Sequence, residues 1–137
     1  MPIRQDTHPL SWLLPAAALF ALAVSLLNRP APVPGIAPTE AYALMRANHA
    51  LVLDVRDKAP YVDGHLPDAL SVPIDQLDRR MHEFAAYRAL PVLVYCGDGV
   101  GRGPLAAAKL KHAGFQRAVN LDGGFPNWRA AGLPIAK

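Results

Sequence analysis

The sequence predicts an α/β domain built on a mainly parallel β-sheet flanked by helices. Short apolar runs at residues 51–53 and 92–95 show no polar alternation, which is typical of strands buried on both faces of a parallel sheet. Segments with apolar residues at helical spacing separate these runs, and this alternation favours a parallel α/β architecture. The chain has 137 residues, which suits one domain with a sizeable core.

Composition excludes several classes of function. The chain is 52% hydrophobic and 18% charged, and its formal net charge of +3 comes from cations dispersed among anions. Nucleic-acid binding calls for a clustered basic face, so we expect no nucleic-acid partner. A single cysteine allows no internal disulfide, and no Cys/His pairing has the spacing of metal ligands, so we expect neither a metal nor a cofactor.

Residues 10–27 form an uncharged, strongly apolar segment that follows a short tail at residues 1–9. This length is near the lower limit for spanning a bilayer, and Trp12 suits a membrane interface, so we expect a single-pass transmembrane anchor. The alternative is a cleaved signal sequence, which would leave a secreted or periplasmic protein. Arg4 and Arg29 flank the segment evenly, so the side of the membrane that holds the domain stays open.

Residues 28–37 are rich in proline and predict an extended linker, in which Gly35 and Ile36 could add a short edge strand. The folded domain is expected at residues 38–137. Within it the patterns predict helices at residues 39–48, 74–87, 104–113 and 125–130, and strands at 51–56, 70–73 and 118–121. Residues 61–69 are expected to form a short turn of helix that breaks into a loop. We expect Thr39 to cap the first of these helices and Trp128 to fill the core.

The most informative stretch runs from Pro91 to Pro104 and reads PVLVYCGDGVGRGP. Cys96 follows the apolar strand and should lie at the carboxyl edge of the sheet, where parallel sheets bind ligands. Glycines alternate through the next residues, so the backbone can turn its N–H groups toward one point. Pro104 suits a helix N-terminus, which favours a thiolate, and Arg102 adds a planar cation. The pattern predicts catalytic roles for Cys96 and Arg102 and an anion-binding loop of Gly97, Asp98, Gly99, Val100 and Gly101.

Three further polar residues are expected to support this edge of the sheet. Asp54 and Arg56 lie two apart at the end of the 51–56 strand, so their side chains point the same way. We expect them to form an ion pair that fixes the following loop. His65 lies in that loop and is expected to hold it by a hydrogen bond rather than to act as a catalytic base.

Residues 38–136 resemble the rhodanese-like domains. The resemblance rests on the order and spacing of several pieces: LDVR at 53–56, YVDGHLPDA at 61–69, VYC at 94–96, GF at 114–115, LDGG at 121–124, Trp128 and GLP at 132–134. It implies a five-stranded sheet flanked by helices and a cysteine that carries sulfane sulfur as a persulfide. The donor would be a small sulfur-containing anion such as thiosulfate, and the acceptor a thiol or cyanide.

The loop departs from the usual pattern of sulfurtransferases in that family, which place an arginine five residues after the cysteine. Here that position is Gly101, and the arginine is Arg102. The longer spacing resembles the loop of dual-specificity cell-cycle phosphatases and arsenate reductases, so a cysteine-dependent enzyme of that type is the alternative. A third possibility is a non-catalytic domain that binds a protein or senses sulfur, although Cys96 and Arg102 argue against it.

The apolar segment leads to a first prediction, which concerns localisation. Membrane fractions should retain the full-length protein through an alkaline carbonate wash, because an anchor at residues 10–27 would lie in the hydrocarbon core. Immunoblotting of the washed pellet measures this. A mature N-terminus beyond Ala23 would instead show a cleaved signal sequence.

Overall fold

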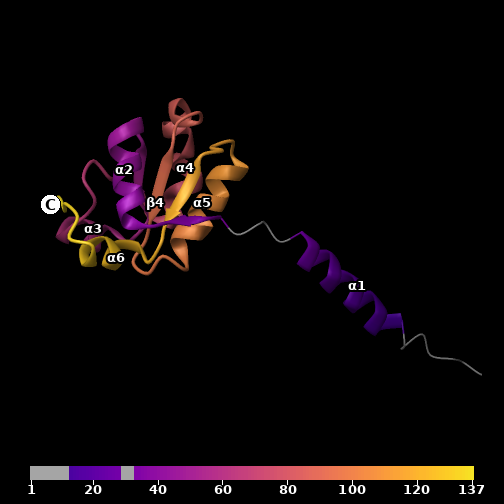
Figure 1. The fold of residues 1–137 in the computed structure, drawn as a ribbon. Helices are drawn as coiled ribbons and strands as arrows, with labels where there is room; N and C mark the ends of the chain where they lie inside the picture. The colour runs from indigo at the N-terminus through magenta and orange to yellow at the C-terminus, as the bar shows by residue number, and fades with distance from the viewer. Residues whose placement is uncertain (1–12, 29–32) are drawn as a thin grey trace, which may run out of the picture. The chain divides into compact units, whose positions relative to one another are not determined.

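The computed structural model describes residues 13–28 and 33–137. Helix α1 (Leu13–Leu27) belongs to one compact unit, and all other elements belong to a second unit, the domain (Figure 1). The domain contains helices α2 (Pro38–Asn48), α3 (Lys58–Asp63), α4 (Ile74–Arg80), α5 (Arg102–His112) and α6 (Gly124–Ala130), and a 3-10 helix η2 (Met81–Tyr87). Its strands are β1 (Gly35–Ile36), β2 (Leu51–Asp54), β3 (Leu70–Ser71), β4 (Val92–Tyr95) and β5 (Ala118–Leu121).

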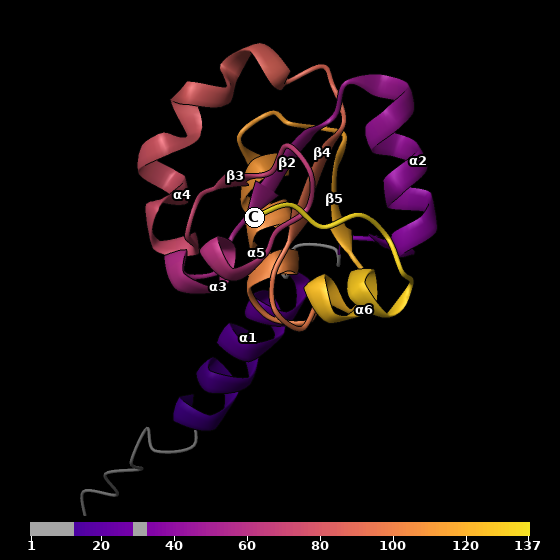
Figure 2. The same ribbon diagram turned by 90° about the vertical axis from the view of Figure 1, so that its left-hand side faces the viewer.

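The five strands form one sheet in the order β1-β5-β4-β2-β3, and every neighbouring pair is parallel (Figure 2). The expected parallel α/β sheet is therefore confirmed. Strands β2 and β4 are its buried centre, and Asp54 lies opposite Tyr95 in their register. Because parallel strands end at the same edge, the residues that follow them, Val55 and Cys96, lie side by side there.

Two hydrophobic clusters cover the two faces of the sheet. On one face, Val55, Val94 and Cys96 pack with Leu77 of α4 and Leu110 of α5. The opposite face packs against α2 and α6 through a second cluster: Ala41, Val52, Leu66, Ala69, Leu93, Tyr95, Leu121 and Trp128. Figure 1 shows these helices on either side of the central strand β4. Residues alternate between the faces along β4, so Tyr95 and Cys96 point to opposite sides.

Gly35 and Ile36 pair with β5, which confirms the short edge strand expected there. Other boundaries differ from the sequence prediction. Helix α2 begins at Pro38 and has no side-chain cap, so the expected capping role of Thr39 is wrong. Proline suits a first helical turn because the missing N–H has no partner there in any case. The 74–87 segment is an α-helix followed by a 3-10 helix rather than one continuous helix.

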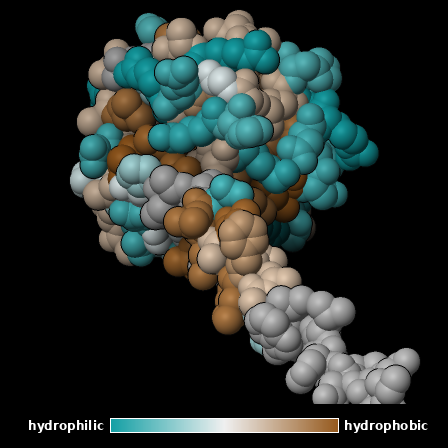
Figure 3. Space-filling view, turned by 90° about the vertical axis from the view of Figure 1, so that its right-hand side faces the viewer, coloured by the Kyte–Doolittle hydropathy of each residue, from teal (hydrophilic) through white to brown (hydrophobic). Residues whose placement is uncertain are grey.

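Helix α1 has 15 residues, and Figure 3 shows that its surface is mainly hydrophobic. Its exposed large side chains include Phe20 and Leu27. In the part of the chain that the structure describes, no helix combines the length and the hydropathy that crossing a membrane requires. The predicted anchor covers residues 10–27, and residues 10–12 lie outside the described part. Membrane anchoring therefore stays a prediction.

Candidate active site at the carboxyl edge of the sheet

Cys96 follows β4 directly, and only 1% of its surface is exposed. The first turn of α5 runs beside its sulfur: a Cβ atom added to Gly103 would lie 3.2 Å from Sγ. Helix α5 begins at Arg102, two residues before Pro104, which the sequence suggested as its first residue. The sulfur therefore sits between a buried strand and a helix N-terminus, as the sequence predicted.

The backbone of the loop contacts the sulfur through one amide. The N–H of Gly99 donates to Sγ of Cys96 at 3.2 Å. The next two amides bind Asp98 instead: the N–H groups of Val100 and Gly101 donate to its Oδ1 at 3.0 and 3.3 Å. The Cys96 thiol also donates to this oxygen, at 3.3 Å. Asp98 is thus bound to the loop amides that the sequence assigned to a substrate.

Two glycines allow the loop to approach a neighbouring turn closely. Gly99 has φ +76°, and a Cβ there would collide with the backbone of Gly123. Gly124 has φ +60°, and a Cβ there would collide with the carbonyl oxygen of Cys96. That carbonyl also accepts a hydrogen bond from the N–H of Phe125 at 2.9 Å. Side chains at either glycine would therefore push the loop away from the turn.

Arg102 lies in the first turn of α5 and is directed at a carboxylate outside the loop. Its Nη1 is 3.3 Å from Oδ1 of Asp57, and the two side chains are 46% and 75% exposed. The expected role of Arg102 as an oxyanion clamp requires this ion pair to open. An exposed pair of this kind is weak, so the cost of opening is small.

Asn120 was not among the residues chosen from the sequence, although the structure places it at the site. It lies on β5 with 2% of its surface exposed, and its Nδ2 donates to the carbonyl oxygen of Gly99 at 3.0 Å. It therefore fixes the residue whose amide contacts Sγ. Its Oδ1 is buried and has no hydrogen-bond partner among the described residues. A polar residue in an apolar strand, three residues before a Gly-Gly turn, was the available signal.

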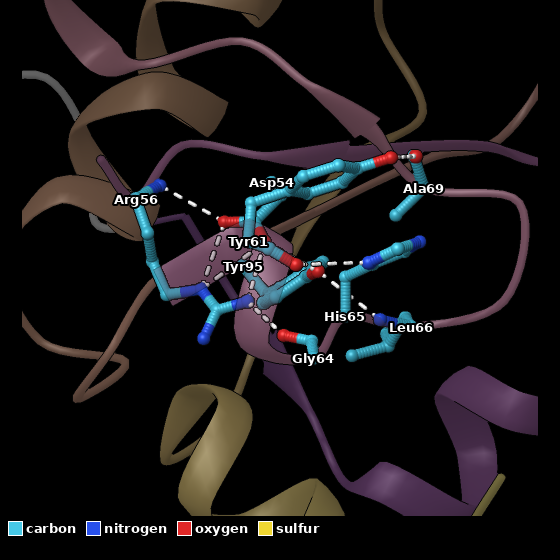
Figure 4. Close-up of polar contacts among 8 residues, drawn as sticks. All are labelled: Asp54, Arg56, Tyr61, Gly64, His65, Leu66, Ala69 and Tyr95. Carbon is cyan, nitrogen blue, oxygen red and sulfur yellow. Dashed lines mark hydrogen bonds and ion pairs between the residues drawn. The ribbon is translucent and has the colours of Figure 1, made fainter. Parts of the chain in front are cut away.

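Asp54 and Arg56 form the expected ion pair, which is confirmed and is buried (Figure 4). Nε of Arg56 donates to Oδ1 of Asp54 at 3.0 Å, and Nη2 donates to Oδ2 at 2.6 Å. The hydroxyl of Tyr95 also donates to Oδ2, at 2.7 Å. Since Tyr95 immediately precedes Cys96, this network fixes the end of the strand that carries the sulfur.

The same network holds the loop at residues 61–69, as Figure 4 shows. Arg56 Nη2 donates to the carbonyl oxygen of Gly64 at 2.7 Å, and the N–H of Leu66 donates to the hydroxyl of Tyr95 at 3.1 Å. His65 Nδ1 lies 3.0 Å from the carbonyl oxygen of Tyr61, and the two rings stack. His65 is thus a hydrogen bonder of this loop, in agreement with the expectation.

Burial and charge fix the ionisation of this network. Burial alone would lower the pKa of Arg56, but the hydrogen bonds and charge of Asp54 outweigh it and raise that pKa. Burial, reinforced by the Asp54 charge, raises the pKa of Tyr95 far above its usual range, so its hydroxyl stays a donor. Within the described residues, no group of three or more His, Cys, Asp or Glu side chains is placed to hold a metal ion.

The domain that carries this site is similar to known proteins. The family model for the rhodanese-like domain matches residues 37–131, so the chain belongs to the rhodanese-like domain family. A sulfurtransferase of Allochromatium vinosum is 39% identical over 85 residues, which are 62% of this chain and 77% of that protein. A tRNA uridine(34) hydroxylase of Escherichia coli is 31% identical over 104 residues, 70% of this chain but only 29% of that protein.

Solved structures agree with this assignment. A thiosulfate sulfurtransferase from Pseudomonas aeruginosa has a TM-score of 0.69 at 27% identity, covering 80% of this chain and 20% of that one. A rhodanese-related protein from Thermoplasma volcanium has a TM-score of 0.67 at 25% identity. The match covers 74% of this chain and 96% of that one. These relatives support a rhodanese-type sulfurtransferase at the level of the family.

The buried ion pair leads to a prediction about stability. Arg56→Ala should lower the free energy of unfolding by about 3–5 kcal/mol, because Asp54 would become an uncompensated buried charge. Lys109→Ala is the matched control, since it breaks the exposed pair with Asp78 and should cost about 0–1 kcal/mol. Urea unfolding curves of the full chain measure both changes. Equal and small decreases in the free energy of unfolding for the two variants would show that the Asp54–Arg56 pair does not stabilise this edge of the sheet.

Proposed function

We propose that the protein is a sulfurtransferase that carries sulfane sulfur as a persulfide on Cys96. The sulfur would come from a thiosulfate-like donor and pass to a thiol or cyanide acceptor. The observation that carries the proposal is the hydrogen bond from the N–H of Gly99 to Sγ of Cys96, at the edge where a parallel sheet binds ligands. An amide in this position stabilises negative charge on the sulfur before and after transfer.

The proposed reaction has two displacements. The Cys96 thiol first loses its proton to water. The thiolate attacks the outer sulfur of thiosulfate, and its S–S bond breaks as sulfite leaves with the electron pair. Cys96 then holds a persulfide. The acceptor thiolate or cyanide attacks the outer sulfur of this persulfide, which forms a new persulfide or thiocyanate and returns the Cys96 thiolate. Neither displacement requires a metal or an oxidant.

The loop residues have separate roles in this scheme. Gly99 would donate to the reacting sulfur, and Asn120 would hold Gly99 in place. Arg102 would bind the departing sulfite after release from Asp57, since a guanidinium matches two oxygens of such an ion. Asp54, Arg56 and His65 would act at a distance, by holding the strand end and the loop beside it.

The alternative, a phosphatase or arsenate reductase, has less support from the contacts. A phosphatase needs a proton donor for its leaving group, and Asp98 is the sole carboxyl group in the loop. Its pKa is lowered by the amide of Val100, by the Cys96 thiol and by the amide of Gly101, so it is ionised at neutral pH. An ionised carboxylate is a poor general acid.

Membrane attachment through residues 10–27 is a separate proposal, supported by the uncharged apolar segment and by the exposed side chains of α1. It does not depend on the chemistry at Cys96.

Parallel assays of the full chain test the proposed function. With thiosulfate and cyanide, the native protein should form thiocyanate, and it should do so faster than it hydrolyses an aryl phosphate or reduces arsenate. Cys96→Ser should reduce thiocyanate formation to the rate without protein, because the nucleophile is lost. Hydrolysis of the aryl phosphate without any thiocyanate would reject the proposal in favour of the alternative.

A deletion variant separates the two chemistries further. Removing Gly101 places Arg102 five residues after Cys96, the usual spacing in rhodanese sulfurtransferases. This deletion should preserve or raise thiocyanate formation and should remove any activity on the aryl phosphate. The opposite pattern would show that the longer loop serves an oxyanion substrate.

A further inference from the structure

The anion-binding loop at residues 97–101 already binds an anion, which is the carboxylate of its own Asp98. Its Oδ1 accepts hydrogen bonds from Val100, Gly101 and the Cys96 thiol at 3.0, 3.3 and 3.3 Å. These three donors also favour the ionised form of the carboxylate, as the lowered pKa of Asp98 indicates. A full negative charge thus lies beside the sulfur that a donor must reach.

The loop arginine is engaged elsewhere. Nη1 of Arg102 lies 3.3 Å from Asp57, which belongs to the segment between β2 and α3. Of the loop amides at positions 99–101, one binds Sγ and two bind Asp98. An anionic donor that approaches Cys96 therefore has to displace the Asp98 carboxylate from its amides or accept its repulsion.

Repulsion between charges grows with the charge on the donor. Thiosulfate carries two negative charges, an aryl thiosulfonate carries one, and a protonated alkyl persulfide carries none. At an exposed site each unit of donor charge is expected to weaken binding by about threefold, so a dianion is weakened by about tenfold. The penalty therefore ranks these donors by their charge.

We propose that Asp98 is a specificity-determining residue, which disfavours doubly charged sulfur donors and selects donors of lower charge such as thiosulfonates and persulfides. The inference rests on the proposed sulfur transfer. With a thiosulfonate the Cys96 thiolate attacks the outer sulfur, the S–S bond breaks, and the sulfinate leaves with the electron pair.

Steady-state kinetics of the full chain test this with two donors. Asp98→Asn removes the charge and keeps an oxygen that accepts from both amides, so the loop retains its hydrogen bonds. The KM for thiosulfate should fall by about tenfold and that for benzenethiosulfonate by about threefold. Glu83→Gln is the control: it removes the same charge from an exposed position on η2, beyond the end of α4 and away from the carboxyl edge, and should change neither value. Equal changes for both donors in Asp98→Asn would overturn the proposal.

Alkylation gives a second test that does not need sulfur transfer. Cys96 is the single cysteine of the chain, so its reaction with iodoacetate, an anion, and with iodoacetamide, which is neutral, is unambiguous. Asp98→Asn should raise the rate with iodoacetate relative to the rate with iodoacetamide by about threefold. Added salt should shrink this difference between the variant and the native protein. An unchanged ratio contradicts the charge-selecting role. If this ratio rises and neither donor transfers sulfur, the proposed function fails while the selection by charge holds.

Discussion

The close approach of two backbone segments at the carboxyl edge of the sheet determines where the reactive sulfur lies. The loop after Cys96 packs against the Gly123–Gly124 turn so tightly that a side chain at Gly99 or Gly124 would meet backbone atoms. The carbonyl of Cys96 is held by Phe125 at the start of α6, and the amide of Gly99 is thereby directed at the sulfur. Parallel pairing of β4 with β2 and β5 brings these segments together, so the site depends on the whole sheet.

Charges at this edge fall into two sets with different consequences. Asp54 and Arg56 are buried and paired through several hydrogen bonds, which makes them costly to separate and therefore suitable as a rigid support. Asp98, Arg102 and Asp57 are exposed, and their contacts are weak enough to exchange when a ligand binds. The rigid set fixes the cysteine-bearing strand, and the exchangeable set meets the substrate.

The fold and the centre of the site could be predicted from the sequence because they depend on local patterns. Uninterrupted apolar runs identified β2 and β4, and the glycines after Cys96 identified a loop with an unusual backbone. The orientation of Arg102 toward Asp57 could not be predicted, because it depends on a contact between residues far apart in the sequence. Asn120 was missed for the same reason: its role appears only when β5 lies beside β4. Asp98 was assigned to the anion-binding loop, but a pattern of residue types could not show that its own carboxylate takes the loop amides.

Intact mass spectrometry of the full chain tests the central claim most directly. After incubation with thiosulfate and removal of small molecules, the protein should gain the mass of one sulfur atom, and peptide mapping should place it on Cys96. Cyanide should then restore the original mass. A chain that never gains sulfur from thiosulfate or from benzenethiosulfonate, although Cys96 still reacts with iodoacetamide, would contradict the account.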